Sequence, residues 1–463
     1  MKIDFTHTEP DNSRLILIFT GWSTGPETGA GISLPGWDTA VVHDYSDMTL
    51  DISFLDRYYT VYLFAWSLGV FAASRTLPSQ RVTAAFAING TTDPVDDSFG
   101  IPAAIFDGTA GGLTVRNLTK FRMRMMRDRA AYDNASHMFS PAAESEIAGL
   151  SRQLATIRQA HRDACGSSDT AYDGGLPWTR AYISSHDRIF PPENQKNAWQ
   201  RDPDVETILL DEAHWVDIGR IARSVISDPS KVSRQFTKAS SSYDTHAIAQ
   251  YSAAMKLAGL LEAGQPHRHG KILEIGCGTG LFTREYAPLL EPSEATFVDI
   301  TETGPFRIAP IEEYVVEDAE RWICRQTAQW DVILSASAIQ WFADIPRFLA
   351  ECHRRLAPGG VLAISTFVPG NMEELDELRP SPLIYPKATQ LREWMSRHFS
   401  DVQVVEDSIR VEFKSAREVL MHLKHTGVAG SAPSGSLQMS DMSHLRSLTY
   451  RPVYVIGKKR PSI

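Results

Sequence analysis

Short continuous apolar runs alternate with amphipathic stretches along the first 227 residues. The expected strands are 14–20, 60–66, a segment ending near Asn89, 179–187 and the run that begins VETILL at Val205. The expected helices are 70–77, 113–135 and 141–163. Continuous apolar strands are typical of parallel sheets that are covered on both faces. The order therefore predicts an α/β unit.

Residues 228–463 repeat this alternation with different spacing. After a helical run at 233–262, the expected strands are 271–275, 295–298, the first part of 331–342, the run after the 357–360 turn, and 449–457. One expected helix begins at Leu281, and three others cover 346–356, 387–398 and 416–424. The helix after the second strand is predicted to be cut short around Gly304-Pro305. The stretch Gly427–Gly435, rich in Ser, Gly and Pro, is either a substrate-entrance loop or linkage.

A polar segment, 224–235, separates the two patterns. Asp228-Pro229 breaks the helix before it, because the residue that precedes a proline is disfavoured in the α conformation. We therefore predict two α/β domains, 1–227 and 228–463.

Composition narrows the functional classes. A net charge of −10 disfavours broad nucleic-acid binding. The N-terminus does not resemble a signal peptide, and no apolar stretch reaches the roughly 20 residues of a membrane span. The four cysteines lack C-x-x-C pairing, which predicts no metal site and a reducing cytoplasm.

The sequence AWSLG at 65–69 joins an expected strand to an expected helix. This is the order of a nucleophile elbow, in which a serine occupies a sharp turn between small residues. Ser67 is the predicted nucleophile. The backbone N–H groups of Leu68 and Trp22 are the predicted oxyanion donors.

A serine nucleophile needs a base and an acid to orient it. In an α/β-hydrolase the acid and then the histidine follow the serine along the chain. Asp187 ends a late strand, and His214 follows the last expected strand of this half. They are the predicted acid and base. The rival histidines, predicted to be surface or packing residues, are His43, His137, His161 and His186.

The long helical segment between the expected strands at 89 and 180 lies where α/β-hydrolases carry a lid, here about 103–174. It contains the cluster KFRMRMMRDR at 120–129. Arg122, Arg124, Arg127 and Arg129 form either a solvated helix face or a docking face for an acidic partner.

Glycines fall at every second position in EIGCGTG, 274–280. They let the backbone turn tightly and approach a ligand. The spacing resembles motif I of the class I S-adenosylmethionine (SAM) methyltransferases, whose fold is Rossmann-like and seven-stranded. Asp299 ends the next strand and suits the ribose hydroxyls. The resemblance implies that SAM contacts Glu274, Gly276, Gly278, Gly280, Asp299, Asp318 and Ala336.

Two further resemblances concern the substrates. FTGW, FAWSLG, INGTTDPVDDSFGIP and SSHDRIFPP, within residues 1–225, resemble the compact pimeloyl-acyl-carrier-protein methyl ester esterases of biotin synthesis. The F-x-x-x-x-x-x-Y-D-x-x-A spacing from Phe236 resembles the malonyl-acyl-carrier-protein O-methyltransferases of the same pathway. It implies that Tyr243 approaches the cofactor and the substrate carboxylate. Arg410 or Arg417 would supply a cation for that carboxylate.

Together these patterns predict a bifunctional enzyme that acts on acyl carrier protein. It would methylate the malonyl carboxylate and later hydrolyse pimeloyl methyl ester. One alternative is a natural-product methyltransferase fused to a thioesterase. The other is a methyltransferase with a non-catalytic docking domain.

Overall fold

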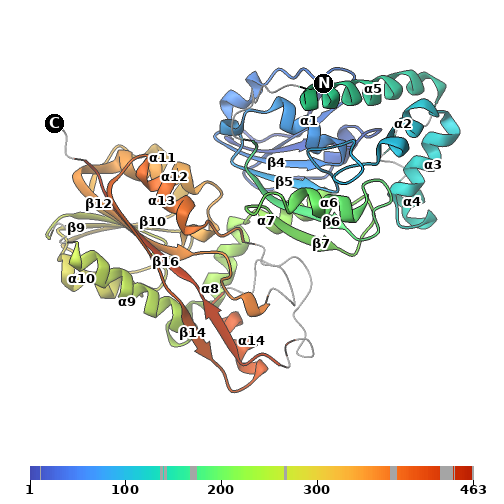
Figure 1. Ribbon diagram of the computed structural model, residues 1–463. Coiled ribbons are helices and arrows are strands. Elements are labelled where there is room, and N and C mark those ends of the chain that lie inside the picture. Colours follow the sequence, from blue (N-terminus) through green and yellow to red (C-terminus); the bar gives the residue numbers. More distant parts are fainter. Residues whose placement is uncertain are drawn as a thin grey trace. The chain divides into compact units, whose positions relative to one another are not determined.

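The computed structural model describes residues 1–10, 12–135, 139, 143–166, 175–264, 268–375, 383–427, 442 and 444–460. The chain divides into two compact units, Met1–Ala222 and Arg223–Ile463 (Figure 1). Helix α7 (Ile218–Val225) spans the division. His137 and most of the stretch Gly427–Gly435 lie outside the described residues.

The first unit is built on a seven-stranded sheet of order β1-β3-β2-β4-β5-β6-β7. Its strands are β1 (Lys2–His7), β2 (Arg14–Phe19), β3 (Asp38–His43), β4 (Thr60–Trp66), β5 (Ala84–Ile88), β6 (Trp178–Ser184) and β7 (Glu206–Leu210). Only β1 runs antiparallel to its neighbour. Every residue of β2 and β4 is buried, as expected of central parallel strands.

Helices α1 (Leu68–Thr76) and α6 (Pro192–Trp199) follow β4 and β6. Between β5 and β6 lie α2 (Ala103–Gly111), α3 (Val115–Met125), α4 (Arg129–Ala135) and α5 (Glu144–Gly166), which Figure 1 shows grouped together. The expected single helix 113–135 is interrupted, because the carbonyl of Met125 accepts a hydrogen bond from the backbone N–H of Trp215 and Met126 is extended.

The second unit has a seven-stranded sheet of order β10-β9-β8-β11-β12-β16-β13. Its strands are β8 (Lys271–Ile275), β9 (Glu294–Asp299), β10 (Ile311–Val316), β11 (Trp330–Ala336), β12 (Leu356–Phe367), β13 (Ser400–Glu406) and β16 (Pro452–Lys458). β16 pairs antiparallel with β12 and β13, and the remaining pairs are parallel. A two-stranded sheet joins β14 (Ile409–Glu412) to β15 (Ser447–Tyr450).

Helices cover both faces of this sheet. Figure 1 shows α9 (Ile248–Ala263) and α10 (Thr283–Leu290) on one face, and α11 (Ala319–Arg325), α12 (Ile345–Arg355) and α13 (Ala388–Ser396) on the other. Separate hydrophobic cores lie under the two sets. Helix α8 (Pro229–His246) contacts α14 (Ala416–His425). The helix after β9, predicted to be cut short, is absent from residues 300–310.

The expected strand 449–457 divides at Arg451 into β15 and β16, which belong to different sheets. The backbone N–H of Arg451 donates to the side chain of Asn371, 3.1 Å away, instead of joining either ladder. The predicted fold class is confirmed: an α/β-hydrolase with a helical lid is followed by a class I methyltransferase fold.

Candidate active sites

Ser67 occupies the turn between β4 and α1. Its backbone has φ 59° and ψ −128°, a conformation that costs energy for a non-glycine residue and that clusters at functional sites. Close packing holds the turn in place. A Cβ at Gly69 would lie 2.4 Å from the carbonyl oxygen of Phe19, and one at Gly90 would lie 2.3 Å from that of Ser67. Only glycine fits at these two positions.

The structure brings Ser67, His214 and Asp187 together from three separate loops. Nε2 of His214 lies 2.9 Å from the hydroxyl oxygen of Ser67, and Nδ1 lies 2.8 Å from the carboxylate of Asp187. The side chains of His214 and Asp187 are buried. This geometry suits proton transfer from the serine to an imidazole that the carboxylate orients.

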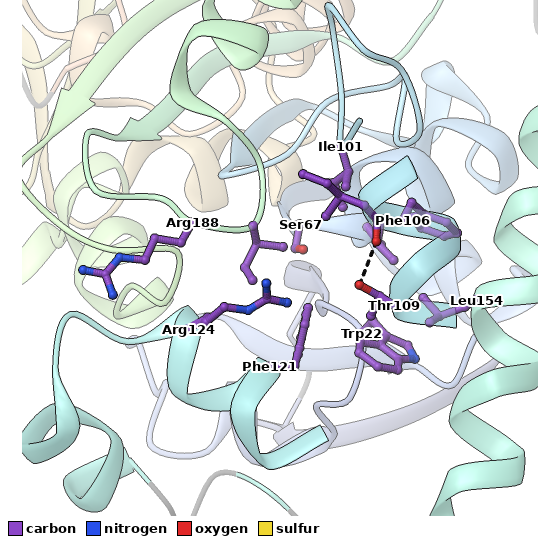
Figure 2. A pocket seen from close by; sticks show the side chains of 12 residues that line it. Trp22, Ser67, Ile101, Phe106, Thr109, Phe121, Arg124, Leu154 and Arg188 are labelled. Carbon is purple, nitrogen blue, oxygen red and sulfur yellow. Dashed lines mark hydrogen bonds between the residues drawn. The ribbon is translucent and has the colours of Figure 1, made fainter. Parts of the chain in front are cut away.

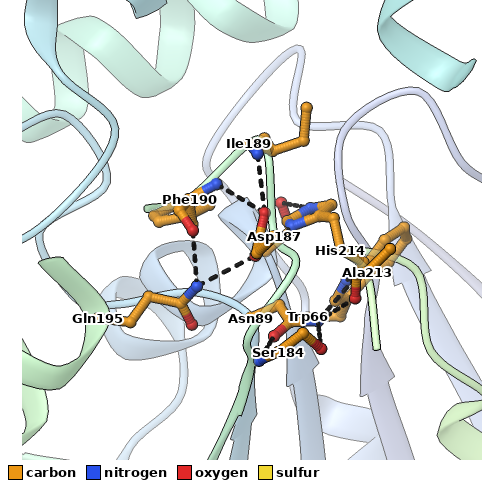
Figure 3. A network of polar contacts seen from close by, with 10 residues as sticks. Trp66, Asn89, Ser184, Asp187, Ile189, Phe190, Gln195, Ala213 and His214 are labelled. Atoms are coloured by element: carbon orange, nitrogen blue, oxygen red, sulfur yellow. Dashed lines mark hydrogen bonds and ion pairs between the residues drawn. The ribbon is translucent and has the colours of Figure 1, made fainter. Parts of the chain in front are cut away.

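Three further hydrogen-bond donors hold the carboxylate of Asp187 (Figure 3). Backbone N–H groups of Ile189 and Phe190 donate to one oxygen of Asp187, at 2.8 and 3.0 Å. The side-chain amide of Gln195 donates to the other oxygen at 3.0 Å, and also to the carbonyl of Phe190. These bonds fix the carboxylate in place for His214.

Backbone hydrogen bonds anchor the loop that carries His214. The carbonyl oxygen of His214 accepts from Nε1 of Trp66 at 2.9 Å and from the side-chain amide of Asn89 at 2.8 Å. Asn89 also binds the hydroxyl and the backbone N–H of Ser184. We did not predict roles for Gln195, Asn89 and Trp66, because isolated polar or aromatic residues carry no motif.

A cavity of about 440 Å³ adjoins the Ser67 side chain (Figure 2). Trp22 and Leu68, the predicted oxyanion donors, line it beside the serine. The helical segment between β5 and β6, the predicted lid, supplies most of the remaining wall: Ile105, Phe106, Thr109, Phe121, Arg124 and Leu154. A cavity lined mainly by apolar side chains suits an acyl chain.

The four predicted docking arginines do not share one environment. Arg124, Arg127 and Arg129 are exposed, whereas Arg122 is only 3% exposed. Arg122 lies against the ring of Phe139 and donates to the carbonyl of Ser23. It is therefore a structural residue of the lid and not part of a docking face. Arg188, which we did not predict, lines the cavity together with Arg124.

The three rival histidines that the structure describes, His43, His161 and His186, lie outside the serine–histidine–aspartate group. His186 pairs with Asp211, and His43 pairs with Asp4. His161 is buried against Phe71, where desolvation lowers its pKa.

In the second unit the glycine turn after β8 adopts the conformation that its spacing predicts. Gly276, Gly278 and Gly280 have φ of 72°, 50° and 78°. A Cβ at Gly276 would lie 2.3 Å from that of Ala338, whereas a Cβ at Gly278 would meet nothing within 4 Å. The turn therefore packs against the chain on one side and leaves room for a ligand at Gly278.

Asp299, at the end of β9, faces this turn. One carboxylate oxygen accepts from the backbone N–H of Gly278 at 2.8 Å, and the other accepts from the N–H and hydroxyl of Thr301. The open space beside Gly278 and the adjoining carboxylate fit a nucleoside with ribose hydroxyls.

Glu274, on β8 just before the turn, is buried. Its side chain is 1% exposed, and one carboxylate oxygen accepts from the hydroxyls of Thr283 and Tyr286, each at 2.6 Å. Burial raises its pKa to about 7. The side chain of Glu274 ties β8 to α10, and its contact with the cofactor stays a prediction.

The other predicted contacts lie at strand and helix ends. Asp318 caps α11 by accepting from the backbone N–H of Glu320, and Ala336 is the last residue of β11. Tyr243 lines a second cavity, of about 360 Å³, with Gln340 and Trp341. Arg410 and Arg417 do not line that cavity; Arg410 is exposed and pairs with Glu412.

Among the described residues, no helix is long and apolar enough to cross a membrane. Within the same part of the chain, no group of three or more His, Cys, Asp or Glu side chains is placed to hold a metal ion.

Comparison with known proteins agrees with this two-part architecture. Residues 1–218 match the family model of the pimeloyl-ACP methyl esterase BioG, and residues 273–362 match a methyltransferase domain. A malonyl-[acyl-carrier protein] O-methyltransferase of Bacteroides fragilis is 31% identical over 97% of this chain and 94% of its own length.

Two further matches each cover one part of the chain. A malonyl-[acyl-carrier protein] O-methyltransferase of Porphyromonas gingivalis is 32% identical over 50% of this chain and 96% of its own length. The crystal structure of BioG from Haemophilus influenzae is 32% identical, covers 47% of this chain and 95% of that one, and has a TM-score of 0.42.

The fold and the two sites define an α/β-hydrolase unit with a serine–histidine–aspartate group, joined to a class I methyltransferase unit. The chain belongs to the family that fuses a pimeloyl-ACP methyl esterase domain to a malonyl-[acyl-carrier protein] O-methyltransferase. The resemblance inferred from the sequence is confirmed.

Proposed function

We propose that this chain methylates malonyl-acyl-carrier protein with SAM and hydrolyses the methyl ester of pimeloyl-acyl-carrier protein. The observation that carries the second activity is the 2.9 Å contact between Ser67 and His214 at the wall of an apolar cavity. Family membership carries the first activity.

In the hydrolase unit, Ser67 attacks the ester carbonyl while His214 takes its proton. The backbone N–H groups of Trp22 and Leu68 stabilise the oxyanion. His214 returns the proton to the methoxy group, and methanol leaves. Water, deprotonated by His214, then attacks the acyl-serine and releases the free carboxylate. The lid residues around the cavity hold the apolar acyl chain.

The acyl carrier protein docks on the lid in this proposal. Arg124, Arg127 and Arg129 are exposed, and Arg124 also lines the cavity. Arg127 and Arg129 make ion pairs with exposed carboxylates, which are weak and are readily exchanged for those of a partner. Arg188 adds a further positive charge at the cavity.

In the methyltransferase unit, Gly276, Gly278 and Gly280 would hold SAM, and Asp299 would bind its ribose. Asp318 and Ala336 would border the adenine, and Tyr243 would lie beside the acceptor. Bound SAM supplies an electrophilic methyl group. A malonyl carboxylate is already ionised at neutral pH, so the transfer needs alignment and no general base.

The first proposed activity forms a methyl ester, and the second removes it. A free carboxylate is costly to bury in an apolar chain-elongation pocket, and methylation removes that charge. Hydrolysis restores the carboxylate once elongation is complete.

All four cysteines are free, which supports the cytoplasmic location that we propose.

The test is to give this chain to two biotin auxotrophs, one lacking each activity, and to follow the purified protein by mass spectrometry. We expect both strains to grow. We also expect malonyl-carrier protein to gain one methyl group and pimeloyl methyl ester to lose one. Rescue of the methyltransferase mutant alone would favour a non-catalytic docking domain. Rescue of neither would favour the natural-product alternative.

A further inference from the structure

The cavity of about 360 Å³ in the second unit has no charged residue among the described residues that line it. Six aromatic side chains form much of its wall: Phe236, Tyr243, Trp341, Phe367, Tyr385 and Tyr450. The amides of Gln250, Gln340 and Asn371 supply polar atoms. None of these described residues would offer a cationic side chain to an anion inside the cavity.

One strong donor in this wall has no partner. Nε1 of Trp341 is buried, and no described residue accepts a hydrogen bond from it. A buried N–H group without an acceptor is costly, and a bound ligand that accepts from it would remove that cost. The ring of Phe236 packs edge-on against Trp341, at 5.9 Å between centroids, and fixes the indole.

The cavity adjoins the glycine turn. Ser337, which lines the cavity, precedes Ala338, the residue that packs against Gly276. Tyr243 lies on the helix whose Asp244 accepts hydrogen bonds from Thr279 of the turn and from Arg284. A carboxylate in the cavity would therefore lie next to a ligand held at Gly278.

We propose that this cavity binds the acceptor carboxylate through the neutral N–H of Trp341, without a cationic side chain, and that the sulfonium of SAM balances the charge. The inference rests on the proposed methyltransferase function and names the group that holds its substrate. A neutral donor leaves the carboxylate oxygens more nucleophilic than an arginine would. It also makes acceptor binding depend on a charged methyl donor, because an unpaired buried carboxylate is costly.

The test measures binding of malonyl-carrier protein by calorimetry and not turnover. The chain is first saturated with sinefungin, which carries an ammonium in place of the sulfonium, or with S-adenosylhomocysteine, which is neutral at sulfur. We expect malonyl-carrier protein to bind at least about tenfold more tightly to the sinefungin complex. The carrier protein bearing malonyl methyl ester, which lacks the anion, should not discriminate.

A matched variant isolates the indole N–H. Trp341→Phe keeps an aromatic ring against Phe236 and removes the donor. We expect it to weaken malonyl-carrier binding about 10- to 100-fold and to leave binding of the methyl ester and of sinefungin unchanged. Unchanged sinefungin binding shows that the variant is folded.

Three results would overturn the inference. One is equal affinity of malonyl-carrier protein for the two complexes. The second is wild-type affinity in Trp341→Phe. The third is selective loss of malonyl-carrier binding in Arg410→Gln or Arg417→Gln. If the wild-type chain with sinefungin binds no malonyl-carrier protein at all, the proposed substrate fails as well, and the inference falls with it.

Discussion

The guanidinium of Arg122 donates a hydrogen bond to the carbonyl of Ser23, 3.3 Å away, and so ties lid helix α3 to the turn after β2. Two other contacts join the same turn to the lid. Nε1 of Trp22 donates to the carbonyl of Leu150 at 3.0 Å, and the ring of Phe121 packs edge-on against Trp22. The lid therefore holds the loop that carries a proposed oxyanion donor.

Arg122→Met should lower kcat for hydrolysis of a short acyl ester by about tenfold, because the N–H of Trp22 loses its position. KM for that ester should change little, since Arg122 does not line the cavity. Steady-state kinetics with Arg129→Gln as the control would check this. An unchanged kcat in a folded Arg122→Met protein would contradict the role of Arg122 in positioning the turn that carries Trp22.

Gln195→Leu should lower kcat/KM for ester hydrolysis by about tenfold, because Asp187 loses a charge-assisted hydrogen bond. KM for that ester should change little, because Gln195 does not line the cavity beside Ser67. Lys196→Met, an exposed neighbour on α6, is the control. An unchanged kcat/KM in a folded Gln195→Leu protein would contradict this role.

Arg124→Gln should raise KM for the carrier-bound methyl ester about fivefold and leave a short soluble ester unaffected, because only the carrier protein presents an acidic surface. The effect should shrink as salt screens the interaction. Kinetics at two ionic strengths with both substrates test this. Equal losses on both substrates would place Arg124 in acyl binding instead of carrier docking.

Glu274 should make the second unit less stable as pH rises. Its pKa is raised from 4.5 to about 7 by burial, so the folded state binds more protons than the unfolded chain between these values. The stabilisation is full below about pH 4.5 and is lost as pH rises to 7, by about 3 kcal/mol. Glu274→Gln should therefore be more stable than wild type at pH 8 and about equal at pH 5. Urea unfolding of both proteins at both pH values measures this difference. An equal difference in unfolding free energy between variant and wild type at pH 5 and at pH 8 would contradict the prediction.

The sequence predicted those parts of the fold and sites that depend on local patterns. Continuous apolar runs located β2 and β4, and glycine spacing located the turn after β8. Strands β1 and β10 were missed because they lie at sheet edges, where partial exposure leaves no continuous apolar run.

Side-chain direction and long-range contacts were harder to predict. Arg122 and Arg124 are two residues apart in one cluster, yet only tertiary packing determines that the first is buried and the second exposed. Glu274 precedes the glycine turn, and only tertiary contacts determine that its carboxylate is buried against Thr283 and Tyr286. The structure brings Ser67, Asp187 and His214 together, and their catalytic role stays a prediction.

The central claim, two independent active sites in one chain, is tested most directly by a pair of variants assayed for both reactions. We predict that Ser67→Ala loses ester hydrolysis by at least about 10⁴-fold and methylates malonyl-carrier protein normally. Gly278→Val places a branched side chain at φ 50° in the cofactor's space, and should lose methylation while hydrolysis continues. Hydrolysis that survives in Ser67→Ala, or methylation that survives in Gly278→Val, would contradict the account.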